Sequence, residues 1–371
     1  MVKIVADECI PFVSEYFSKL GELVLLPGRQ IKATDVADAE ILLVRSITKV
    51  DAALLKHSTV RFVGTVTAGF DHLDIEWLEK NNIAYTSLPG FNAPPVANYV
   101  IGVLAALQRR QLFPQYHGRV AVIGVGATGS LVANALKAIG VDVVLCDPLR
   151  AKLESDFKHC YLNAIDNVDA ISLHVPLVKE GFYPTDGFID KAFLQRQKPN
   201  AVLINASRGA VLNEEDILST FKGQLCLDVY KGEPTISLPL FTRAVIATPH
   251  IAGYSVQAKL RGITSLYNHM REKNILPAMP DIVKELPRQT LSFAGRAPHW
   301  QDVLLGIFNP LLMTNMMHTL MQDEATRSEA FDRMRDTFNY RHEFAFTNVE
   351  CDTLLSEDRE VLQALGVGCG D

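Results

Sequence analysis

Short apolar runs alternate with helical patterns over the first 95 residues of the chain. The apolar runs predict strands, and the segments between them, such as 13–20, 52–56 and 75–80, predict helices. Strands that alternate with helices are typical of a parallel sheet with helices on both faces. Residues 1–95 are therefore expected to form a small α/β domain. Its predicted strands cover residues 3–6, 22–26, 41–44, 62–65 and 83–86.

A second series of strands follows a proline-containing break at 92–95. Residues 96–108 predict an apolar helix, and another helix is predicted over 255–271. Because strands and helices alternate again, residues 96–254 are expected to form a second α/β domain. Its predicted strands cover residues 120–123, 142–145, 170–173, 201–204, 224–227 and 244–247.

The C-terminal part of the chain has a different pattern. Pro277, Pro280 and Pro287 predict a linker. After it, residues 301–321 form a long apolar-rich stretch with several methionines, and 344–346 form a short strand-like run. A helical apolar stripe of this kind is typical of a core or a subunit interface, and this part of the sequence carries no motif that indicates chemistry.

Three glycines follow the predicted strand at 120–123 with the spacing G-x-G-x-x-G, namely Gly124, Gly126 and Gly129. In a strand–loop–helix unit the first permits a tight turn, the second lets a pyrophosphate approach the backbone, and the third lets the helix pack on its strand. The next strand is followed by Asp147, at the spacing of the acid that binds the ribose hydroxyls of NAD. We therefore expect a dinucleotide site with NAD as cofactor, while Arg150 nearby leaves NADP as an alternative.

Composition narrows the classes of partner. The chain has 42 acidic and 36 basic side chains, and its net charge of −6 disfavours nucleic acid and membrane surfaces as partners. No apolar run is long enough to span a bilayer, and the N-terminal residues lack the pattern of a signal peptide. The six cysteines are scattered without a C-x-x-C pair, which is typical of free thiols in a reducing cytoplasm. No metal-ligand spacing is found, so no metal is expected.

Three polar residues follow apolar runs of the second domain and together could transfer a hydride to or from a 2-hydroxy acid. Arg208 suits the substrate carboxylate, because a guanidinium binds it through two parallel hydrogen bonds. His250 suits the proton of the hydroxyl, because its pKa lies near working pH. Glu233 could hold the other imidazole nitrogen and favour the charged form of His250. Each residue alone is more often an ordinary surface or core side chain, but their joint position at strand ends favours an active site.

The chain resembles the D-2-hydroxyacid dehydrogenases over residues 1–280. The resemblance rests on the glycine loop with Asp147 and on the motifs NASRG at 205–209, GEP at 232–234 and TPHIAG at 248–253. It implies an α/β fold of two Rossmann-like, doubly wound parallel-sheet domains. It also implies that Arg208, Glu233 and His250 are catalytic. The family pattern further implies that residues 255–280 complete a substrate-binding domain at 1–95, whereas 96–254 bind NAD.

Further stretches resemble those members of the family that act on a phosphorylated 2-hydroxy acid and carry an additional α+β dimerisation domain, here residues 283–371. They are VRSITKV at 44–50, FVGTVTAGFDH at 62–72, KEGFYPT at 179–185 and IAGY at 251–254. The resemblance implies a homodimer, and it implies that Ser46, Thr67 and Tyr254 contact the substrate. It also implies an NAD site lined by Asp147, Val175, Ala206, Ser207, Arg208, Asp228 and Gly253. Arg45, Ser46 and Lys49 could bind the distal phosphate of the substrate.

Two alternatives remain open from the sequence. The first is a D-3-phosphoglycerate dehydrogenase or another D-2-hydroxyacid dehydrogenase, because sequence discriminates substrates of similar length poorly. The second is an NAD-sensing interaction protein similar to the transcriptional corepressors that resemble this family. The presence of Arg208, Glu233 and His250 together favours an enzyme.

Overall fold

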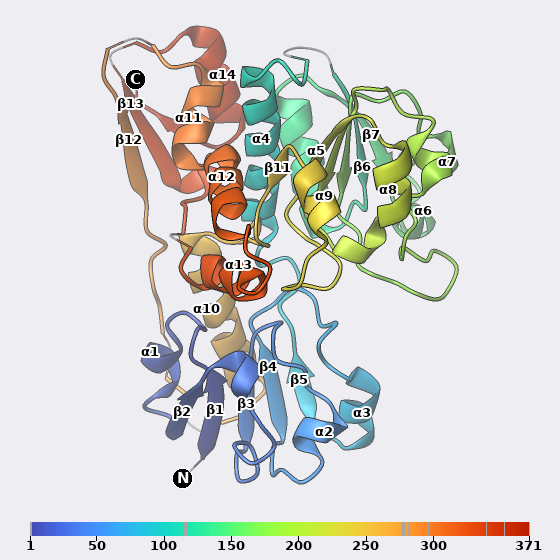
Figure 1. Ribbon diagram of the computed structural model, residues 1–371. Coiled ribbons are helices and arrows are strands. Elements are labelled where there is room, and N and C mark those ends of the chain that lie inside the picture. Colours follow the sequence, from blue (N-terminus) through green and yellow to red (C-terminus); the bar gives the residue numbers. More distant parts are fainter. Residues whose placement is uncertain are drawn as a thin grey trace. The chain divides into compact units, whose positions relative to one another are not determined.

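The computed structural model describes residues 2–114, 118–276, 279–280, 282–295, 297–338, 340–351 and 353–370 (Figure 1). The chain divides into two compact units. The first unit comprises Met1–Asn92 and Val256–Leu286, and the second comprises Ala93–Ser255 and Pro287–Asp371. Pro280 and Pro287 lie in irregular backbone after the last helix of the first unit, whereas Pro277 falls outside the described residues.

The first unit is built on a parallel sheet with strand order β2-β1-β3-β4-β5. Successive residues of its central strands face opposite cores. Ile4 packs in a cluster with helices α1 and α10, whereas Val5 packs in a cluster with α2 and α3. Burial on both faces explains the continuous apolar runs in the sequence. The elements are β1 (Lys3–Asp7), α1 (Val13–Phe17), β2 (Glu22–Leu26), β3 (Ile41–Val44), α2 (Ala52–Leu55), β4 (Phe62–Thr65), α3 (Ile75–Lys80), β5 (Ala84–Thr86) and α10 (Val256–Glu272).

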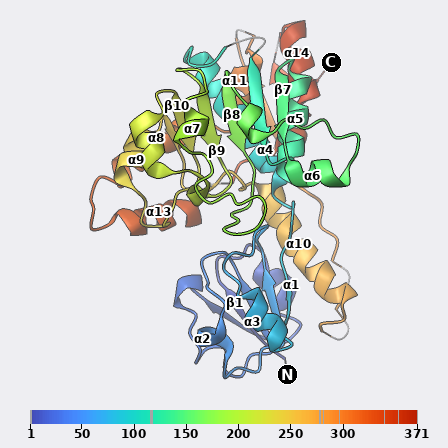
Figure 2. The same ribbon diagram turned by 90° about the vertical axis from the view of Figure 1, so that its right-hand side faces the viewer.

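The second unit contains a parallel sheet with strand order β11-β10-β9-β8-β6-β7 (Figure 2). The chain moves outward from β6 in both directions, so the switch point of the sheet lies between β6 and β8. In open α/β sheets the ligand crevice is found at such a point, beyond the carboxyl ends of the strands. The strands are β6 (Arg119–Ile123), β7 (Asp142–Cys146), β8 (Ala170–Leu173), β9 (Val202–Asn205), β10 (Gln224–Leu227) and β11 (Ile246–Ala247).

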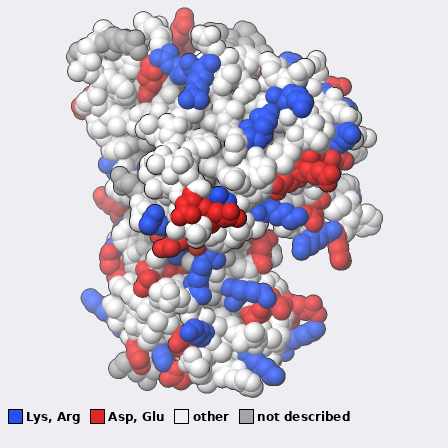
Figure 3. Space-filling model, in the orientation of Figure 1, with Lys and Arg blue, Asp and Glu red and all other residues white. Residues whose placement is uncertain are grey.

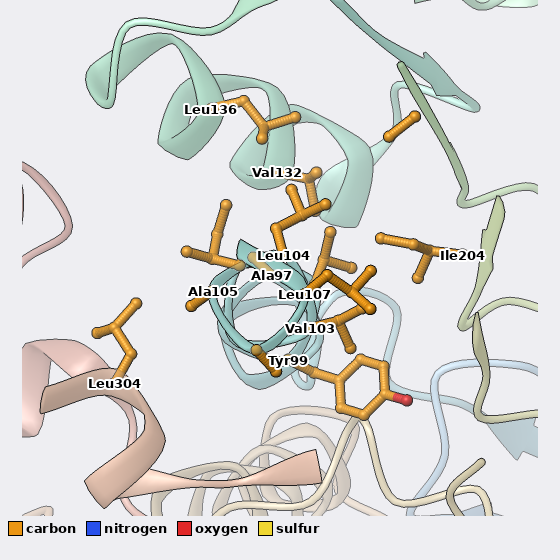
Figure 4. Packing of buried hydrophobic residues seen from close by; sticks show 14 of the residues in the cluster. Ala97, Tyr99, Val103, Leu104, Ala105, Leu107, Val132, Leu136, Ile204 and Leu304 are labelled. Carbon is orange, nitrogen blue, oxygen red and sulfur yellow. The ribbon is translucent and has the colours of Figure 1, made fainter. Parts of the chain in front are cut away.

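Helix α4 (Ala93–Arg109) is buried along most of its length and packs against α5 (Ala127–Ala138). Tyr99, Leu107 and Val132 belong to the core around it (Figure 4). The boundary between the two compact units lies between Asn92 and Ala93, within the predicted break at 92–95. The helix begins earlier than the predicted residue 96, because Pro94 and Pro95 lie in the first turn of α4, where a missing N–H removes no helical hydrogen bond. The other helices of this part are α6 (Pro148–Leu153), α7 (Lys191–Leu194), α8 (Glu214–Thr220) and α9 (Leu238–Arg243).

Within its described residues, the C-terminal segment (287–370) forms a small parallel sheet, β12-β13-β14, and the helices α11 to α14. Leu304 joins the core around α4 (Figure 4), and Trp300 belongs to the same cluster. Residues from 287 onward belong to the same compact unit as 93–255. The elements are β12 (Gln289–Phe293), α11 (Trp300–Ile307), α12 (Pro310–Leu320), α13 (Arg327–Asp336), β13 (Thr347–Cys351), α14 (Ser356–Ala364) and β14 (Gly368–Cys369).

Two details of this segment differ from the sequence prediction. The apolar stretch at 301–321 forms two helices bent by 44°, because Asn309 caps α12 by accepting a hydrogen bond from Leu311 N and Pro310 begins that helix. The predicted strand at Phe344–Phe346 is wrong, since these residues form a 3-10 helix and the strand begins at Thr347. The Phe344 amide donates to Asn98 Oδ1 at 3.0 Å, so tertiary contacts replace a strand ladder there.

Other structural properties bear on the class of protein. Within the described ranges, no single helix has the length and apolar character of a membrane span, and only the bent pair α11 and α12 meets these criteria jointly. Among the same residues, no cluster of three or more His, Cys, Asp or Glu side chains could hold a metal ion. All six cysteines are free thiols. Acidic and basic side chains are interspersed on the face shown in Figure 3.

Candidate active site

The glycine loop joins β6 to α5 at the switch point of the larger sheet. Gly124 has a φ of 84°, and a Cβ there would lie 2.7 Å from the carbonyl group of His174. A Cβ on Gly129 would lie 1.9 Å from the Gly124 oxygen, so only glycine allows the helix to pack this closely. Gly126 precedes the helix, and no described atom lies within 4 Å of the position of a Cβ there. This open space at a helix N-terminus fits a dinucleotide pyrophosphate.

Asp147 is held against the glycine loop. Its carboxylate accepts hydrogen bonds from Val125 N at 2.8 Å and from Arg150 N at 2.9 Å, and the second contact caps α6. The Arg150 guanidinium donates from Nη1 to Val125 O and to Ser130 Oγ, both at 2.9 Å, and from Nε to Glu154 at 2.9 Å. Because these contacts engage the Arg150 guanidinium, it is less available to bind the 2'-phosphate of an NADP molecule. Asp147, which follows β7, therefore favours NAD.

The turn after β9 is organised by Asn205. The Asn205 Oδ1 atom accepts from the amide and the hydroxyl of Ser207 at 3.1 and 2.9 Å, and its Nδ2 atom donates to Arg208 O at 2.9 Å. Asn205 thus fixes the backbone of Ala206, Ser207 and Arg208. Asn205 begins the NASRG motif, and its role in the turn was not predicted, although asparagine at the start of a turn is itself a recognisable signal. Val175 lies near the same edge, because its Cγ1 atom would be 2.8 Å from a Cβ on Gly124.

Arg208 follows this turn and is half-buried. Its Nη1 atom donates to Ser207 O at 2.9 Å. The next residue, Gly209, touches the loop after β10, since a Cβ there would lie 2.0 Å from the carbonyl carbon of Tyr230 and 2.2 Å from Lys231 N. Gly209 therefore brings the turn that carries Arg208 into direct backbone contact with the loop that carries Glu233.

Gly209→Ala is expected to lower the free energy of unfolding by about 1–3 kcal/mol, because the added methyl group overlaps backbone that cannot rotate away. The kcat of the variant should also fall, since the two loops must separate. Gly102→Ala is a matched control inside α4, where the nearest atom to a Cβ is Phe308 O at 3.9 Å. That change is expected to be neutral or stabilising. Chemical denaturation of both variants tests the difference, and equal unfolding midpoints would contradict the close-contact argument.

Glu233 and His250 form a hydrogen-bonded pair. The Glu233 Oε2 atom lies 2.7 Å from His250 Nδ1, and Glu233 Oε1 accepts from Tyr230 N at 2.8 Å. The pair lies beyond β10 and β11, which are adjacent and parallel, so the two loops emerge at the same edge of the sheet. The His250 side chain is 33% exposed, and Nδ1 is occupied by Glu233, which leaves Nε2 as the nitrogen able to exchange a proton with a ligand.

Asp228 holds the loop that carries His250. Its buried carboxylate accepts from Thr248 Oγ1 at 2.6 Å, Ile251 N at 2.8 Å and Ala252 N at 2.9 Å. Burial raises the pKa of Asp228, against the effect of these donors and of the His250 charge. The His250 backbone has a φ of 57°, so the loop keeps a left-handed residue at the reactive position. The NAD contacts of Asp228 and of half-buried Gly253 remain predictions from the family resemblance.

Opposing influences set the pKa values of Glu233 and His250. Burial alone would lower the pKa of His250, but the charge and hydrogen bond of Glu233 hold it above the ordinary histidine value. Burial alone would raise the pKa of Glu233, but the His250 charge and hydrogen bond hold it below its ordinary value. Glu233 therefore favours the imidazolium, which makes His250 the stronger base.

Glu233→Gln is expected to move the acid limb of the pH profile of kcat/KM to lower pH, by about one unit. Oxidation requires neutral His250, and removing the carboxylate removes the influence that raises the pKa of this imidazole. Initial rates measured across the pH range test the shift. An acid limb that stays in place or moves upward would rule out Glu233 as the group that tunes His250.

The C-terminal segment also holds the His250 loop in position. Arg341 donates from Nη2 to Ala252 O at 2.7 Å and to Pro95 O at 2.9 Å. Ser255 donates to Glu343 at 2.6 Å, and Thr314 Oγ1 accepts from Ala247 N at 3.0 Å. These residues carry no local sequence signal, because their roles depend on contacts between distant parts of the chain. Tyr254, half-buried, lies in an aromatic cluster with Phe338 and Tyr340.

The remaining predicted substrate residues belong to the first unit. Ser46 is exposed after β3, and Thr67 follows β4 and donates to Gly69 O at 2.6 Å. Arg45 binds the fully buried Asp7 through Nε at 2.8 Å and Nη2 at 3.3 Å. Lys49 is mostly exposed and pairs with Asp51 at 2.7 Å. Ser46 and Thr67 thus lie at the carboxyl edge of one parallel sheet, where ligands of α/β proteins bind.

Comparison with known proteins agrees with this fold. Residues 105–252 match the family model described as "D-isomer specific 2-hydroxyacid dehydrogenase, NAD binding domain", and relatives that are 35–42% identical span most of the chain. The chain therefore belongs to the D-isomer specific 2-hydroxyacid dehydrogenase family, and NAD is the cofactor of its larger sheet.

The relatives are named erythronate-4-phosphate dehydrogenase. The protein of Coxiella burnetii is 42% identical over 93% of this chain and 94% of its own length. That of Azotobacter vinelandii is 38% identical over 98% and 99%, and that of Escherichia coli O157:H7 is 35% identical over 95% and 94%.

Solved structures confirm the predicted Rossmann-like α/β fold. D-lactate dehydrogenase from Aquifex aeolicus superposes with a TM-score of 0.61 at 23% identity, covering 73% of this chain and 95% of that chain. The 3-phosphoglycerate dehydrogenase of Entamoeba histolytica gives 0.62 at 21% identity, covering 75% and 97%. At these identities the likeness concerns the fold alone.

Proposed function

We propose that this chain oxidises 4-phospho-D-erythronate with NAD to 3-hydroxy-2-oxo-4-phosphonooxybutanoate, a step of pyridoxal 5'-phosphate synthesis. The observation that carries the proposal is the 2.7 Å contact between Glu233 and His250, in a chain 42% identical to an enzyme of that name over 93% of its length. An acid–base pair beside a dinucleotide site is the machinery that such an oxidation needs.

The roles of the three catalytic residues follow from their positions and chemistry. His250 Nε2 accepts the proton of the C2 hydroxyl as the C2–H bond breaks and the C2 carbonyl forms. Glu233 holds Nδ1 and stabilises the imidazolium that results. Arg208 binds the substrate carboxylate through two parallel hydrogen bonds and orients C2. When bound, NAD supplies the hydride acceptor.

The residues that would hold NAD are those at the switch point of the larger sheet. Gly126 and the first turn of α5 would accept the pyrophosphate, and Asp147 would bind the ribose hydroxyls. Val175, Ala206, Ser207, Asp228 and Gly253 complete the proposed site, where Val175 can offer only its backbone.

The substrate would be recognised by Ser46, Thr67 and Tyr254, with Arg45 and Lys49 as candidates for the distal phosphate. The ion pair between Arg45 and buried Asp7 supports a fixed orientation for Arg45, whereas exposed Lys49 is the more mobile cation. We also propose that the enzyme works in the cytoplasm as a homodimer joined through residues 283–371.

A substrate panel tests the proposed function. Purified protein is given NAD or NADP with 4-phosphoerythronate, 3-phosphoglycerate, erythronate or lactate, and reduced cofactor is followed by absorbance. The proposal requires the highest kcat/KM for 4-phosphoerythronate with NAD. A preference for 3-phosphoglycerate or an unphosphorylated acid would assign another substrate, and NAD binding without turnover would contradict an enzymatic role.

A further inference from the structure

The burial of Arg335, a cation of the C-terminal segment, is not explained by its hydrogen bonds and ion pairs. Arg335, near the end of α13, is only 6% exposed, and within the described parts of the chain its Nε atom has no hydrogen-bond partner. Its ion pair with Asp332, from Nη1 to Oδ1, is long at 3.8 Å. A buried guanidinium is costly unless other groups compensate it, so the position of Arg335 indicates a role at a neighbouring site.

The neighbouring site is the catalytic pair. Arg335 is hydrogen-bonded to the side chain of Tyr254, which lies four residues after His250. Its guanidinium lies 5.9 Å from the ring centre of Phe331, and that ring packs edge-on against Tyr230 at 6.0 Å. Tyr230 in turn donates its amide to Glu233, so α13 packs on the loop that orients the catalytic carboxylate.

A second contact fixes α13 to the same loop. Thr235 Oγ1 lies 2.9 Å from Ser328 Oγ. Thr235 is two residues after Glu233, and Ser328 lies in the first turn of α13. The helix is thus attached to the Glu233 loop near its first turn, and Arg335 reaches Tyr254 from its last turn. The position of the Arg335 charge is therefore set by two separate contacts with the catalytic loops.

The charge of Arg335 opposes that of Glu233 at the imidazole. Glu233 and Asp228 raise the pKa of His250, whereas Arg335 lowers it. Arg335 also lowers the pKa of Glu233. Burial alone would lower the pKa of Arg335, but Tyr254, Glu233 and Asp332 together raise it, so the guanidinium stays charged.

We propose that Arg335 is a positioning residue of the dehydrogenase, which holds Tyr254 and, through α13, the loop of Glu233 in the arrangement that the proton transfer by His250 needs. This inference rests on the proposed function, because it assigns His250 the role of base in an oxidation. It also gives the C-terminal segment a part in the chemistry of its own subunit, separate from the proposed dimerisation.

Arg335→Met tests the proposal against two matched variants. Arg335→Lys keeps a charge on the same helix, and Arg333→Met removes a charge from an exposed position two residues away. For Arg335→Met we expect the acid limb of the kcat/KM profile to move to higher pH by about one unit, with a raised KM as Tyr254 loses its partner. This direction is opposite to that of Glu233→Gln. Arg335→Lys should restore most of the limb, and Arg333→Met should leave it in place.

A measurement without substrate separates this inference from the proposed function. The His250 imidazole is titrated by NMR in the wild type and in both Arg335 variants, and its signal is assigned by its loss in His250→Asn. A midpoint that rises in Arg335→Met and returns in Arg335→Lys supports the inference even if 4-phosphoerythronate is not the substrate. Unchanged midpoints in folded variants would overturn it. If Arg335→Met does not fold, Arg335→Gln replaces it, because this variant removes the charge and keeps hydrogen-bonding groups: a raised midpoint supports the inference, and an unchanged midpoint overturns it.

Discussion

Replacing His250 with asparagine is expected to lower kcat by about 10²–10⁴-fold while NAD still binds with its normal affinity. The variant loses the group that accepts the hydroxyl proton, so the substrate must release that proton to water as the hydride leaves. Asparagine is the suitable replacement because the backbone at this position has a φ of 57°, which asparagine tolerates better than alanine. The loop held by Asp228 should therefore keep its shape.

The measurement combines initial rates, followed through NADH absorbance, with NAD titration monitored by calorimetry. His57→Asn is the control, since this histidine is exposed in the first unit. Near-normal turnover in His250→Asn would remove His250 from the mechanism. A loss of NAD binding in parallel with turnover would instead assign this residue to the cofactor site.

Arg208→Met is expected to lower kcat/KM by about 10²–10⁴-fold, because a guanidinium that grips a carboxylate makes two charge-assisted hydrogen bonds of about 1.5–3 kcal/mol each. The kcat/KM of Arg208→Lys should lie between those of the wild type and Arg208→Met, since an ammonium group keeps the charge but cannot form the two parallel hydrogen bonds. The intermediate value distinguishes a geometric role from a purely electrostatic one.

Two controls make the Arg208 result interpretable. Arg110→Met removes an exposed arginine at the end of α4 and should leave kcat/KM unchanged. The pH profile of Arg208→Met should keep the acid limb of the wild type, because Arg208 is assigned to the substrate and His250 sets that limb. Equal kcat/KM for Arg208→Met and the wild type would exclude Arg208 as the carboxylate ligand.

The C-terminal segment supports the two loops that carry Glu233 and His250. Arg341, Glu343 and Thr314 bind backbone or side chains between Ala247 and Ser255, and α13 packs on the loop of Glu233. The loops that carry Glu233 and His250 are therefore held in place by residues that come after both Rossmann-like sheets in the sequence. Changes in this segment are expected to alter activity.

The sequence by itself determined the architecture and the class of chemistry. The predicted strands at 41–44 and 62–65 have the observed bounds, because strands buried on both faces leave continuous apolar runs. The partly exposed edge strand at 22–26 also has its predicted bounds. The sequence also predicted the glycine loop, because each of its glycines meets a local steric requirement. Arg208, Glu233 and His250 stood out because parallel topology brings the residues that follow neighbouring strands to one edge.

Only the tertiary structure decided what surrounds those residues. Arg341 binds carbonyl groups 89 and 246 positions earlier in the chain, and no local period encodes such a contact. The strand predicted at Phe344–Phe346 failed because the amide of Phe344 binds Asn98 on α4 instead of a neighbouring strand. Arg335 looked like any charged residue of a polar helix until packing buried it beside Tyr254. Local sequence fixes backbone preference and burial pattern, whereas the environment of a buried charge depends on segments that meet only in the folded chain.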